Sequence, residues 1–401
     1  MASTAPPRTG SRSGPVAAVG GVGRTGPGWV LMFSGSPWRA AAHRQHALAR
    51  ELAADWRVVF VDPPGNRPRW RWTVRRVDDS LWHAVPPAVL PFGRHLPAVN
   101  RLTRRVEAAL LDHWLRHRAH GPAGEPSGAR IVWLDEDLAW PVPARLDPTV
   151  VVYDATDLDW TFTRRWNRAH LHRALRAAVG AADLVLASSS ALPERLPAAR
   201  RPPVVIANGC DPHRFTADGP VAAGLTGLPR PILGYLGAVD TRAFDAELVA
   251  TVARRRPEWT FALVGPSTRA GRAPLAGLPN VRLSPPVPFA DAPALVRGFD
   301  VGIIPYRTGG LVDYVHPKKC FEYLSAGRPV VATALPALRD LGAPIRLAAT
   351  AGQFEAAVED ELRTAWCPEA VDLRRAVAAR HSWAARGTRL RKLLAEVPAL
   401  R

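Results

Sequence analysis

Short hydrophobic runs recur along the chain, and most are followed by small or charged residues and then by a segment with helical spacing. Runs of this kind are typical of buried parallel strands. In the first half of the chain they lie at 29–33, 57–61, 131–134, 149–153, 184–187 and 204–207. In the second half they lie at 232–236, 260–264, 280–283, 301–304 and 330–331. The alternation predicts an α/β fold with two Rossmann-like, doubly wound domains that face a cleft.

Changes in composition suggest where these domains begin and end. Residues 1–28 are rich in Pro, Gly, Ser and Arg without an apolar core, so we expect a disordered tail and neither a signal peptide nor a membrane span. The first domain is predicted at 29–215, with a helix from about 40 to 54, and a Gly-, Pro- and Ala-rich linker at 216–230. The second domain is predicted at 231–385, followed by a C-terminal helix at 386–401. No apolar run approaches the ~20 residues that a transmembrane helix needs.

Two segments of the first domain combine apolar and basic residues. Residues 69–75 alternate between the two kinds, which favours either an edge strand with its tryptophans packed inward or an interfacial patch. Residues 99–114 predict an amphipathic helix that could also lie on anionic lipid. Its expected apolar face is Val99, Leu102, Val106, Leu110 and Trp114, with Arg101, Arg104 and Arg105 on another face. The histidines at 113, 117 and 120 have a metal-like spacing but no zinc motif, so we expect a solvated face.

The chain is strongly basic, with a net charge of +18 from 53 Lys and Arg against 35 Asp and Glu. Such a field favours anionic partners: nucleoside diphosphates, an acidic membrane surface or nucleic acid. The arginines are dispersed and no nucleic-acid-binding motif accompanies them, which argues against nucleic acid. The three cysteines, at 210, 320 and 367, fit neither a disulfide framework nor a zinc site. We therefore expect a cytoplasmic protein, at the inner face of the plasma membrane if the basic surfaces bind lipid.

The most informative stretch is 313–333, DYVHPKKCFEYLSAGRPVVAT. It predicts a helix from Lys318 to Ala326 that Pro317 can begin and Gly327 ends. Lys318 and Lys319 fall in the first turn, where each cation costs about 0.3–1 kcal/mol unless an anion binds there. The only other lysine is Lys392, so this pair stands out against the arginine-rich background.

Glu322 follows the two lysines by one helical turn. Its carboxylate could accept both hydroxyl groups of a ribose, as acidic residues do in other nucleotide sites. The alternative is a surface ion pair between Lys318 and Glu322. Gly234 within the 232–236 run and Gly237 just after it would let the backbone approach a diphosphate bound at the lysines, and we expect Arg242 at the start of the next helix.

The motif HPKKCFEYLSAGRPVVAT resembles the donor-site motif of retaining, nucleotide-sugar-dependent glycosyltransferases of the GT-B fold (family 4-like, glycosyl transferases group 1). It most resembles the subgroup that makes teichuronic acid and other cell-surface polysaccharides. Glu322 matches the Glu that begins the run before the Gly-Pro-Val-Val ending. The family often has a second Glu eight positions earlier, where this chain has Tyr314 beside Asp313. The Asn208-Gly209-x-Asp211 turn is similar to the one that leads into the second domain, and the final helix is implied to cross back to the first.

The resemblance implies transfer of a sugar, with retention of configuration, from a nucleoside-diphosphate sugar to a glycan or lipid-linked acceptor at the cell surface. Asp313 is the candidate to replace the second Glu of the family, which this chain lacks. Tyr153-Asp154 with Asp157 resembles a YD-x-x-D signature of the subgroup, although Asp157 could instead cap a helix. We expect no metal and no other cofactor, because the lysines serve the diphosphate; the Asp-x-Asp at 135–137 is the alternative. The implied catalytic residues are Asp313, Tyr314 and Lys318; the donor-binding residues are Gly237, Arg242, Gly265, Val287, Tyr306, Lys318, Lys319 and Glu322; the acceptor-side residues are Trp38, Arg44, Asp154 and Asp157.

Two other functions remain open from the sequence. A nucleotide-sugar epimerase can share this fold, and the altered carboxylate is also compatible with a non-catalytic partner protein that binds a sugar nucleotide.

Overall fold

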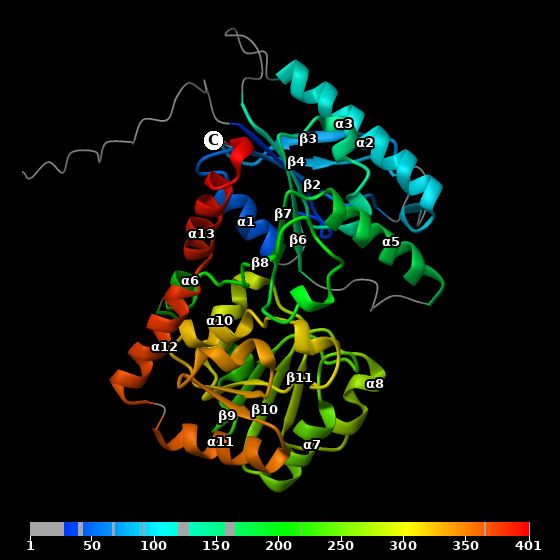
Figure 1. The fold of residues 1–401 in the computed structure, drawn as a ribbon. Helices are drawn as coiled ribbons and strands as arrows, with labels where there is room; N and C mark the ends of the chain where they lie inside the picture. The colour runs from blue at the N-terminus through cyan, green and yellow to red at the C-terminus, as the bar shows by residue number, and fades with distance from the viewer. Residues whose placement is uncertain are drawn as a thin grey trace, which may run out of the picture.

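Two mainly parallel sheets with helices packed against them form two lobes, the first upper and the second lower in Figure 1. The computed structural model describes residues 28–38, 43–65, 69–88, 90, 93–118, 128–156, 165–216, 218–364 and 366–400. The tail expected at 1–28 lies outside these residues except for Gly28. The predicted α/β class with two Rossmann-like domains is confirmed.

The sheet of the first domain has the strand order β3-β4-β2-β1-β5-β6-β7-β8, and only β3 runs antiparallel to its neighbour. Its strands are β1 (Trp29–Phe33), β2 (Arg57–Val61), β3 (Thr73–Arg76), β4 (Leu81–Val85), β5 (Arg130–Leu134), β6 (Val150–Ala155), β7 (Leu184–Ala187) and β8 (Val204–Val205). Trp29 pairs in register with Arg57 of β2 and Arg130 of β5. The carboxyl ends of these strands therefore meet at one edge, where ligands bind in such folds.

The helices of the first domain cover both faces of this sheet. They are α1 (Arg44–Leu52), α2 (Pro97–Arg118), α3 (Pro143–Leu146) and α5 (Arg165–Ala181). Leu31 and Phe33 belong to one hydrophobic cluster, whereas Val30 and Met32 belong to another. Burial on both faces explains why the strands are continuous hydrophobic runs. The helix predicted from residue 40 begins at Arg44 within the described residues.

Helix α2 exposes part of the stripe that the sequence placed against the core. Leu102 is 59% exposed and Val106 is 38% exposed. Arg104 is buried instead, where it donates to Glu107 (2.8 Å) and pairs with Glu136. The prediction that Arg104 lies with Arg101 and Arg105 on a face apart from the packed one is therefore wrong, because two buried carboxylates compensate its charge.

The Trp/Arg segment ahead of β3 behaves as an edge strand only in part. Regular pairing spans Thr73–Arg76, and Trp72 packs partly buried against the core. Trp70, by contrast, is 74% exposed. Inward packing is thus confirmed for Trp72 and wrong for Trp70.

The sheet of the second domain is wholly parallel, with the order β11-β10-β9-β12-β13-β14. Its strands are β9 (Ile232–Leu236), β10 (Thr260–Val264), β11 (Val281–Ser284), β12 (Val301–Ile304), β13 (Val330–Thr333) and β14 (Ile345–Ala348). Three of them, β9, β10 and β12, begin and end where the sequence predicts. β9 and β12 are neighbours although residues 237–300 separate them, so the order reverses there in the manner of a doubly wound sheet.

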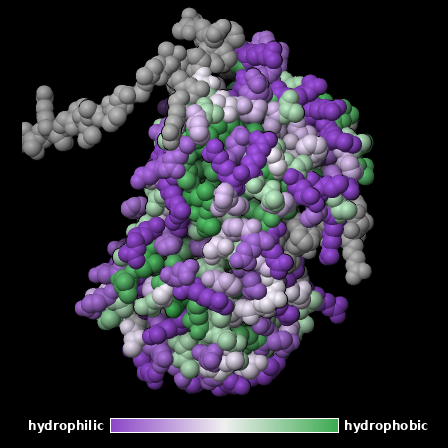
Figure 2. Space-filling view, viewed as in Figure 1, coloured by the Kyte–Doolittle hydropathy of each residue, from purple (hydrophilic) through white to green (hydrophobic). Residues whose placement is uncertain are grey.

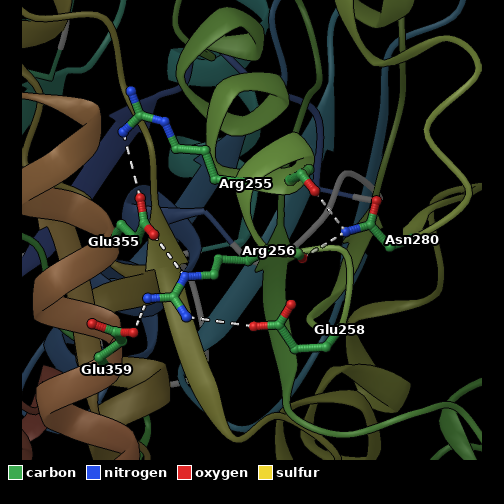
Figure 3. A network of polar contacts seen from close by, with 7 residues as sticks. Arg255, Arg256, Glu258, Asn280, Glu355 and Glu359 are labelled. Atoms are coloured by element: carbon green, nitrogen blue, oxygen red, sulfur yellow. Dashed lines mark hydrogen bonds and ion pairs between the residues drawn. The ribbon is translucent and has the colours of Figure 1, made fainter.

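The remaining helices are α6 (Pro212–Thr216), α7 (Ala246–Arg255), α8 (Arg269–Arg272), α9 (Ala292–Arg297), α10 (Lys319–Ser325), α11 (Ala351–Thr364), α12 (Pro368–Arg380) and α13 (Trp383–Ala395). A polar network joins α7 to α11 (Figure 3). In it, Arg256 Nε donates to Glu355 Oε1 at 2.6 Å, and Asn280 Nδ2 donates to the Arg256 carbonyl at 3.0 Å. This network lies far from the strand ends that face the first domain, so we assign it a structural role.

The chain crosses between the domains twice, and the two crossings pair with each other. Cys210 forms a parallel bridge with Ser382, in which the Trp383 amide donates to the Cys210 carbonyl at 2.9 Å. Helix α13 then packs beside α1 of the first domain (Figure 1), and Arg391 lies 3.4 Å from Asp55. This helix starts at Trp383, ahead of the boundary expected at 385/386.

Hydrophilic residues cover most of the face shown in Figure 2. Among the described helices, none combines the length and the apolar character that crossing a bilayer requires.

Candidate functional site

A cavity of about 680 Å³ lies between the domains. The first domain contributes the start of α1, and the second contributes α10 and the turn at Phe289; the two chain crossings close the remaining side. Its walls are formed by His43, Ala47, Arg50, Glu51, Cys210, Asp211, Pro212, His213, Arg214, Phe289, Lys318, Glu322, Ala379, Ser382, Trp383 and Ala384. The cavity volume is in the range of small-molecule sites.

Glu322 is the acidic residue in the first turn of α10, and it lines this cavity. It is only 5% exposed, and its Oε1 lies 3.5 Å from Lys318 Nζ. The ion pair that the sequence offered as an alternative is therefore present. It is not a plain surface pair, because the carboxylate is buried at the cavity wall.

Lys318 lies at the N-terminus of α10, and its ammonium group points along the cavity. It lies 4.8 Å from the ring centre of Phe289, which Arg214 contacts at 5.3 Å. The predicted helix start is one residue early, because Lys318 is the residue before the first helical turn. His43, on the first domain, faces this charge: burial, and then the proximity of Lys318, lower its pKa below the usual value of 6.5.

Lys319 points in a different direction from Lys318. Its Nζ donates to Tyr306 Oη at 2.9 Å and lies 4.2 Å from the ring centre of Tyr235. A Cβ atom added to Gly237 would lie 2.5 Å from this ammonium group. Lys319 therefore approaches the loop after β9, whereas Lys318 faces the cavity.

Gly237 and Gly265 end the neighbouring strands β9 and β10 with φ values of +155° and +151°. A Cβ atom on Gly265 would lie 2.2 Å from the Gly237 carbonyl oxygen. No side chain fits between the two loops, so backbone groups are presented at the strand ends beside Lys319.

The other predicted donor residues lie around this edge. Tyr306, after β12, is buried and holds Lys319. Val287, after β11, is 40% exposed. Arg242 does not begin the next helix: α7 starts at Ala246, and the Arg242 Nη2 pairs with Asp240 at 3.1 Å in the preceding turn.

Asp313 and Tyr314 have different surroundings, although they are adjacent. The Asp313 carboxylate accepts from the Gly309 amide at 3.0 Å and thereby closes its own loop. Tyr314 faces the first domain: Arg195 Nε donates to its hydroxyl group and Ser189 Oγ donates to its carbonyl oxygen, each at 2.6 Å. Tyr314 thus joins the domains, which the sequence did not indicate.

On the first domain, the structure brings two of the four predicted acceptor-side residues together. Arg44 and Asp154 form a buried ion pair of 2.9 Å, and Arg44 Nη1 also donates to the Ile206 carbonyl at 2.6 Å. Trp38 lies apart from them, packed against Phe60 at 4.9 Å between ring centres. Asp157 lies outside the described residues.

Sequence reasoning missed several residues of the cavity. Phe289, Arg214 and Trp383 line it, but none carries a motif, and Phe289 and Trp383 come from elements 94 positions apart. Among the residues that the structure describes, no three His, Cys, Asp or Glu side chains are placed to hold a metal ion.

Comparisons with known proteins agree with this geometry. Residues 230–363 match the family model of glycosyl transferases group 1. TuaH of Bacillus subtilis (strain 168), provisionally named a teichuronic acid biosynthesis glycosyltransferase, is 30% identical over 211 residues. This match spans 48% of the chain and about half, 53%, of the curated relative.

Solved structures support the fold of the whole chain. Sucrose-phosphate synthase of Thermosynechococcus elongatus superposes with a TM-score of 0.68 at 18% identity, over 93% of this chain and 100% of that one. HepE of Anabaena, solved in complex with UDP, superposes with a TM-score of 0.62 at 13% identity, over 92% and 99% of the two chains. At these identities the likeness shows the two-domain GT-B fold alone.

Proposed function

We propose that this chain, whose residues 230–363 form a glycosyl transferases group 1 domain, transfers a sugar from a nucleoside-diphosphate sugar to an acceptor hydroxyl group. The observation that carries the proposal is the placement of Glu322 and Lys318 in one wall of the interdomain cavity. A buried carboxylate beside an ammonium group offers an acceptor for ribose hydroxyls and a cation for phosphate in the same site.

The two lysines at the start of α10 support a diphosphate leaving group. Lys319 lies against the loop of Gly237, and Lys318 lies at the cavity rim. In the proposed reaction the bond between C1 of the sugar and the diphosphate oxygen breaks, and the acceptor oxygen bonds to C1. Fixed positive charge stabilises the negative charge that develops on the diphosphate. We therefore propose that no metal ion is required.

We further propose that configuration is retained. The departing diphosphate oxygen would then lie near the attacking hydroxyl group and take its proton. Asp313 is our candidate to stabilise the positive charge on the sugar, released from Gly309 when donor binds. Tyr314 serves a positioning role, because its hydroxyl and carbonyl groups are engaged by the first domain.

For the acceptor we propose a glycan or a lipid-linked glycan at an anionic membrane surface. The name of the TuaH relative supports a cell-envelope glycan. The exposed Leu102 and Val106 lie on α2 beside the exposed Arg101 and Arg105, as expected of a helix that rests on anionic lipid. We propose that the buried Arg44–Asp154 pair lies on the acceptor side of the cleft.

A panel of nucleotide sugars tests the proposal. Thermal shift identifies the nucleoside diphosphate that stabilises the fold, since a bound ligand raises stability by mass action. Each stabilising donor is then incubated without and with candidate acceptors. Release of nucleoside diphosphate together with a glycosylated product is expected. Conversion of the donor sugar without any acceptor would indicate an epimerase, and binding without turnover would indicate a non-catalytic partner.

A further inference from the structure

A second, smaller cavity of about 260 Å³ lies in the first domain. It is lined by Pro37, Asp62, Arg69, Thr73, Arg75, His83 and Val85, and it shares no wall residue with the interdomain cavity. Asp62 directly follows β2, and Thr73 pairs with Val85 at the end of β4. The cavity thus lies beyond the carboxyl ends of two parallel strands, the position where doubly wound domains bind ligands.

A chain of contacts fixes the guanidinium group of Arg75 in this cavity. Arg75 lies opposite His83 in the β3–β4 pairing, and its Nε donates to His83 Nδ1 at 3.1 Å. His83 is 3% exposed, and its Nε2 lies 2.9 Å from Asp62 Oδ1. That oxygen also accepts from the Trp38 amide at 2.7 Å. The backbone therefore holds Asp62, the Asp62 carboxylate lies beside His83 Nε2 without a hydrogen bond among the described residues, and His83 Nδ1 holds Arg75.

The side-chain groups that remain available to a ligand at this cavity are mainly cationic. Within the described part of the chain, no carboxylate lies within 4.0 Å of Arg69 or Arg75, and the terminal nitrogens of Arg75 make no hydrogen bond. The Asp62 carboxylate is buried and engaged by Trp38 and His83. Two guanidinium groups and the Thr73 hydroxyl group thus remain as donors toward a ligand.

A histidine beside a carboxylate, as in the Asp62–His83 pair, can also act as a general base. A base needs a free ring nitrogen to take a proton from a substrate. Here Nδ1 of His83 accepts from Arg75 and Nε2 faces Asp62. Because Nδ1 accepts from Arg75, a neutral ring carries its proton on Nε2, so neither nitrogen can take a proton from a substrate and His83 is a positioning residue for Arg75.

The exposed Trp70 lies next to this cavity. An open hollow of about 560 Å³, lined by Arg69, Trp70, Arg71 and Thr73, shares Arg69 and Thr73 with it. Trp70 is 74% exposed, so in the described part of the chain a large apolar ring stands beside two arginines with most of its surface uncovered. Tryptophan next to arginine suits a molecule that carries an anionic group on an apolar body.

We propose that this cavity binds a phosphate group carried by an amphiphilic molecule, with Arg75 and Arg69 on the phosphate and Trp70 along the apolar part. The fork of a guanidinium group suits two phosphate oxygens, and the cavity is small enough to take a head group and not a whole ligand. Naming this molecule as the sugar acceptor rests on the proposed function; the binding itself does not.

The test is calorimetric titration of the full chain with three soluble probes: inorganic phosphate, dihexanoyl phosphatidic acid and dihexanoyl phosphatidylcholine, the lipids below their micelle concentrations. Arg75→Gln should weaken binding of the phosphatidic acid at least about tenfold, the size of one lost charged hydrogen bond. Arg76→Gln is the matched control, since it removes the same charge one position along β3 from a side chain paired with Asp79. Any phosphate bound at Lys318 and Lys319 is common to both variants and cancels in the comparison.

Trp70→Ser separates the two sources of phosphate. It should weaken the phosphatidic acid and leave inorganic phosphate unchanged if the ligand is amphiphilic. Equal losses in the Arg75 and Arg76 variants would overturn the site, because they would indicate non-specific attraction. Phosphate binding that depends on Arg75 but not on Trp70, for every probe, would overturn the amphiphilic part. Failure here leaves nucleotide binding at the interdomain cavity untouched, so it is distinguishable from failure of the proposed function.

Discussion

Replacing Glu322 by Gln tests the ribose-binding role at the residue where the site is most specific. The side chain is 5% exposed and lines the interdomain cavity beside Lys318. Gln has the same shape, so the cavity is preserved while the negative charge is lost. Lys318 is partly exposed, with 32% of its side chain accessible, and can be solvated when its partner is neutralised. We therefore expect a small change in stability and a large change in binding.

The size of the effect follows from the hydrogen bonds that are lost. Hydrogen bonds to a charged group contribute about 1.5–3 kcal/mol, roughly twice as much as neutral ones. The Gln amide oxygen can still accept one hydroxyl group, so the loss corresponds to about one charged bond. The dissociation constant of the nucleoside diphosphate should rise about 10- to 100-fold.

Calorimetry with two ligands isolates the ribose contacts. The nucleoside diphosphate selected by thermal shift is compared with its 2′,3′-dideoxy analogue. The wild-type chain should bind the dideoxy analogue about 10- to 100-fold more weakly than the nucleoside diphosphate, which is roughly the effect of Glu322→Gln on the nucleoside diphosphate itself. Glu322→Gln should leave the affinity for the dideoxy analogue nearly unchanged. Glu247→Gln is the matched control, because Glu247 also lies in the first turn of a helix of the second domain but is exposed. Equal weakening of both ligands by Glu322→Gln, or no weakening of either, would refute the ribose role.

Three further outcomes follow from the structure. Gly265→Ala should lower the free energy of unfolding by about 1–3 kcal/mol or more, because its Cβ would lie 2.2 Å from the Gly237 carbonyl oxygen at φ +151°. Scanning calorimetry measures this loss. In the same experiment the control Gly180→Ala should raise the melting temperature slightly, because its Cβ enters open space in helix α5. Burial lowers the pKa of His46 from 6.5 to about 4 and the pKa of His316 from 6.5 to about 3. Below pH 6.5 the unfolded state therefore binds more protons than the folded state, and the free energy of unfolding should fall by up to about 1.4 kcal/mol per pH unit for each histidine as the pH falls toward 4. A melting temperature that rises as the pH is lowered from 6.5 to 4.5 would contradict this. Sugar transfer should survive EDTA, and a strict requirement for an added divalent cation would return attention to the acidic cluster at 135–137.

The parts of the fold that the sequence predicts well are those governed by local rules. β1, β9, β10 and β12 are short hydrophobic runs, and the structure reproduces their limits. Helix α10 ends at Ser325, and Gly327 follows two positions later with a φ of +71°, the left-handed conformation that glycine favours after a helix.

The parts that the sequence did not predict depend on partners far away in the chain. Arg104 is buried because Glu136, 32 residues later, supplies a compensating carboxylate. Arg44 and Asp154 are 110 residues apart, so no spacing rule connects them. Tyr314 was interpreted by its distance from Glu322, yet its surroundings are set by Arg195 of the other domain. Periodicity identifies elements, whereas the site depends on how distant elements meet.

The central claim is that two lysines of α10, Lys318 at the interdomain cavity and Lys319 at the Gly237 loop, recognise one diphosphate. Calorimetric titration with the selected nucleoside diphosphate tests it most directly, using Lys318→Met/Lys319→Met against Lys392→Met, the only other lysine. The account predicts that the double variant binds at least about tenfold more weakly while the control binds like the wild type. Unchanged affinity in the double variant, with its fold intact, would contradict the account.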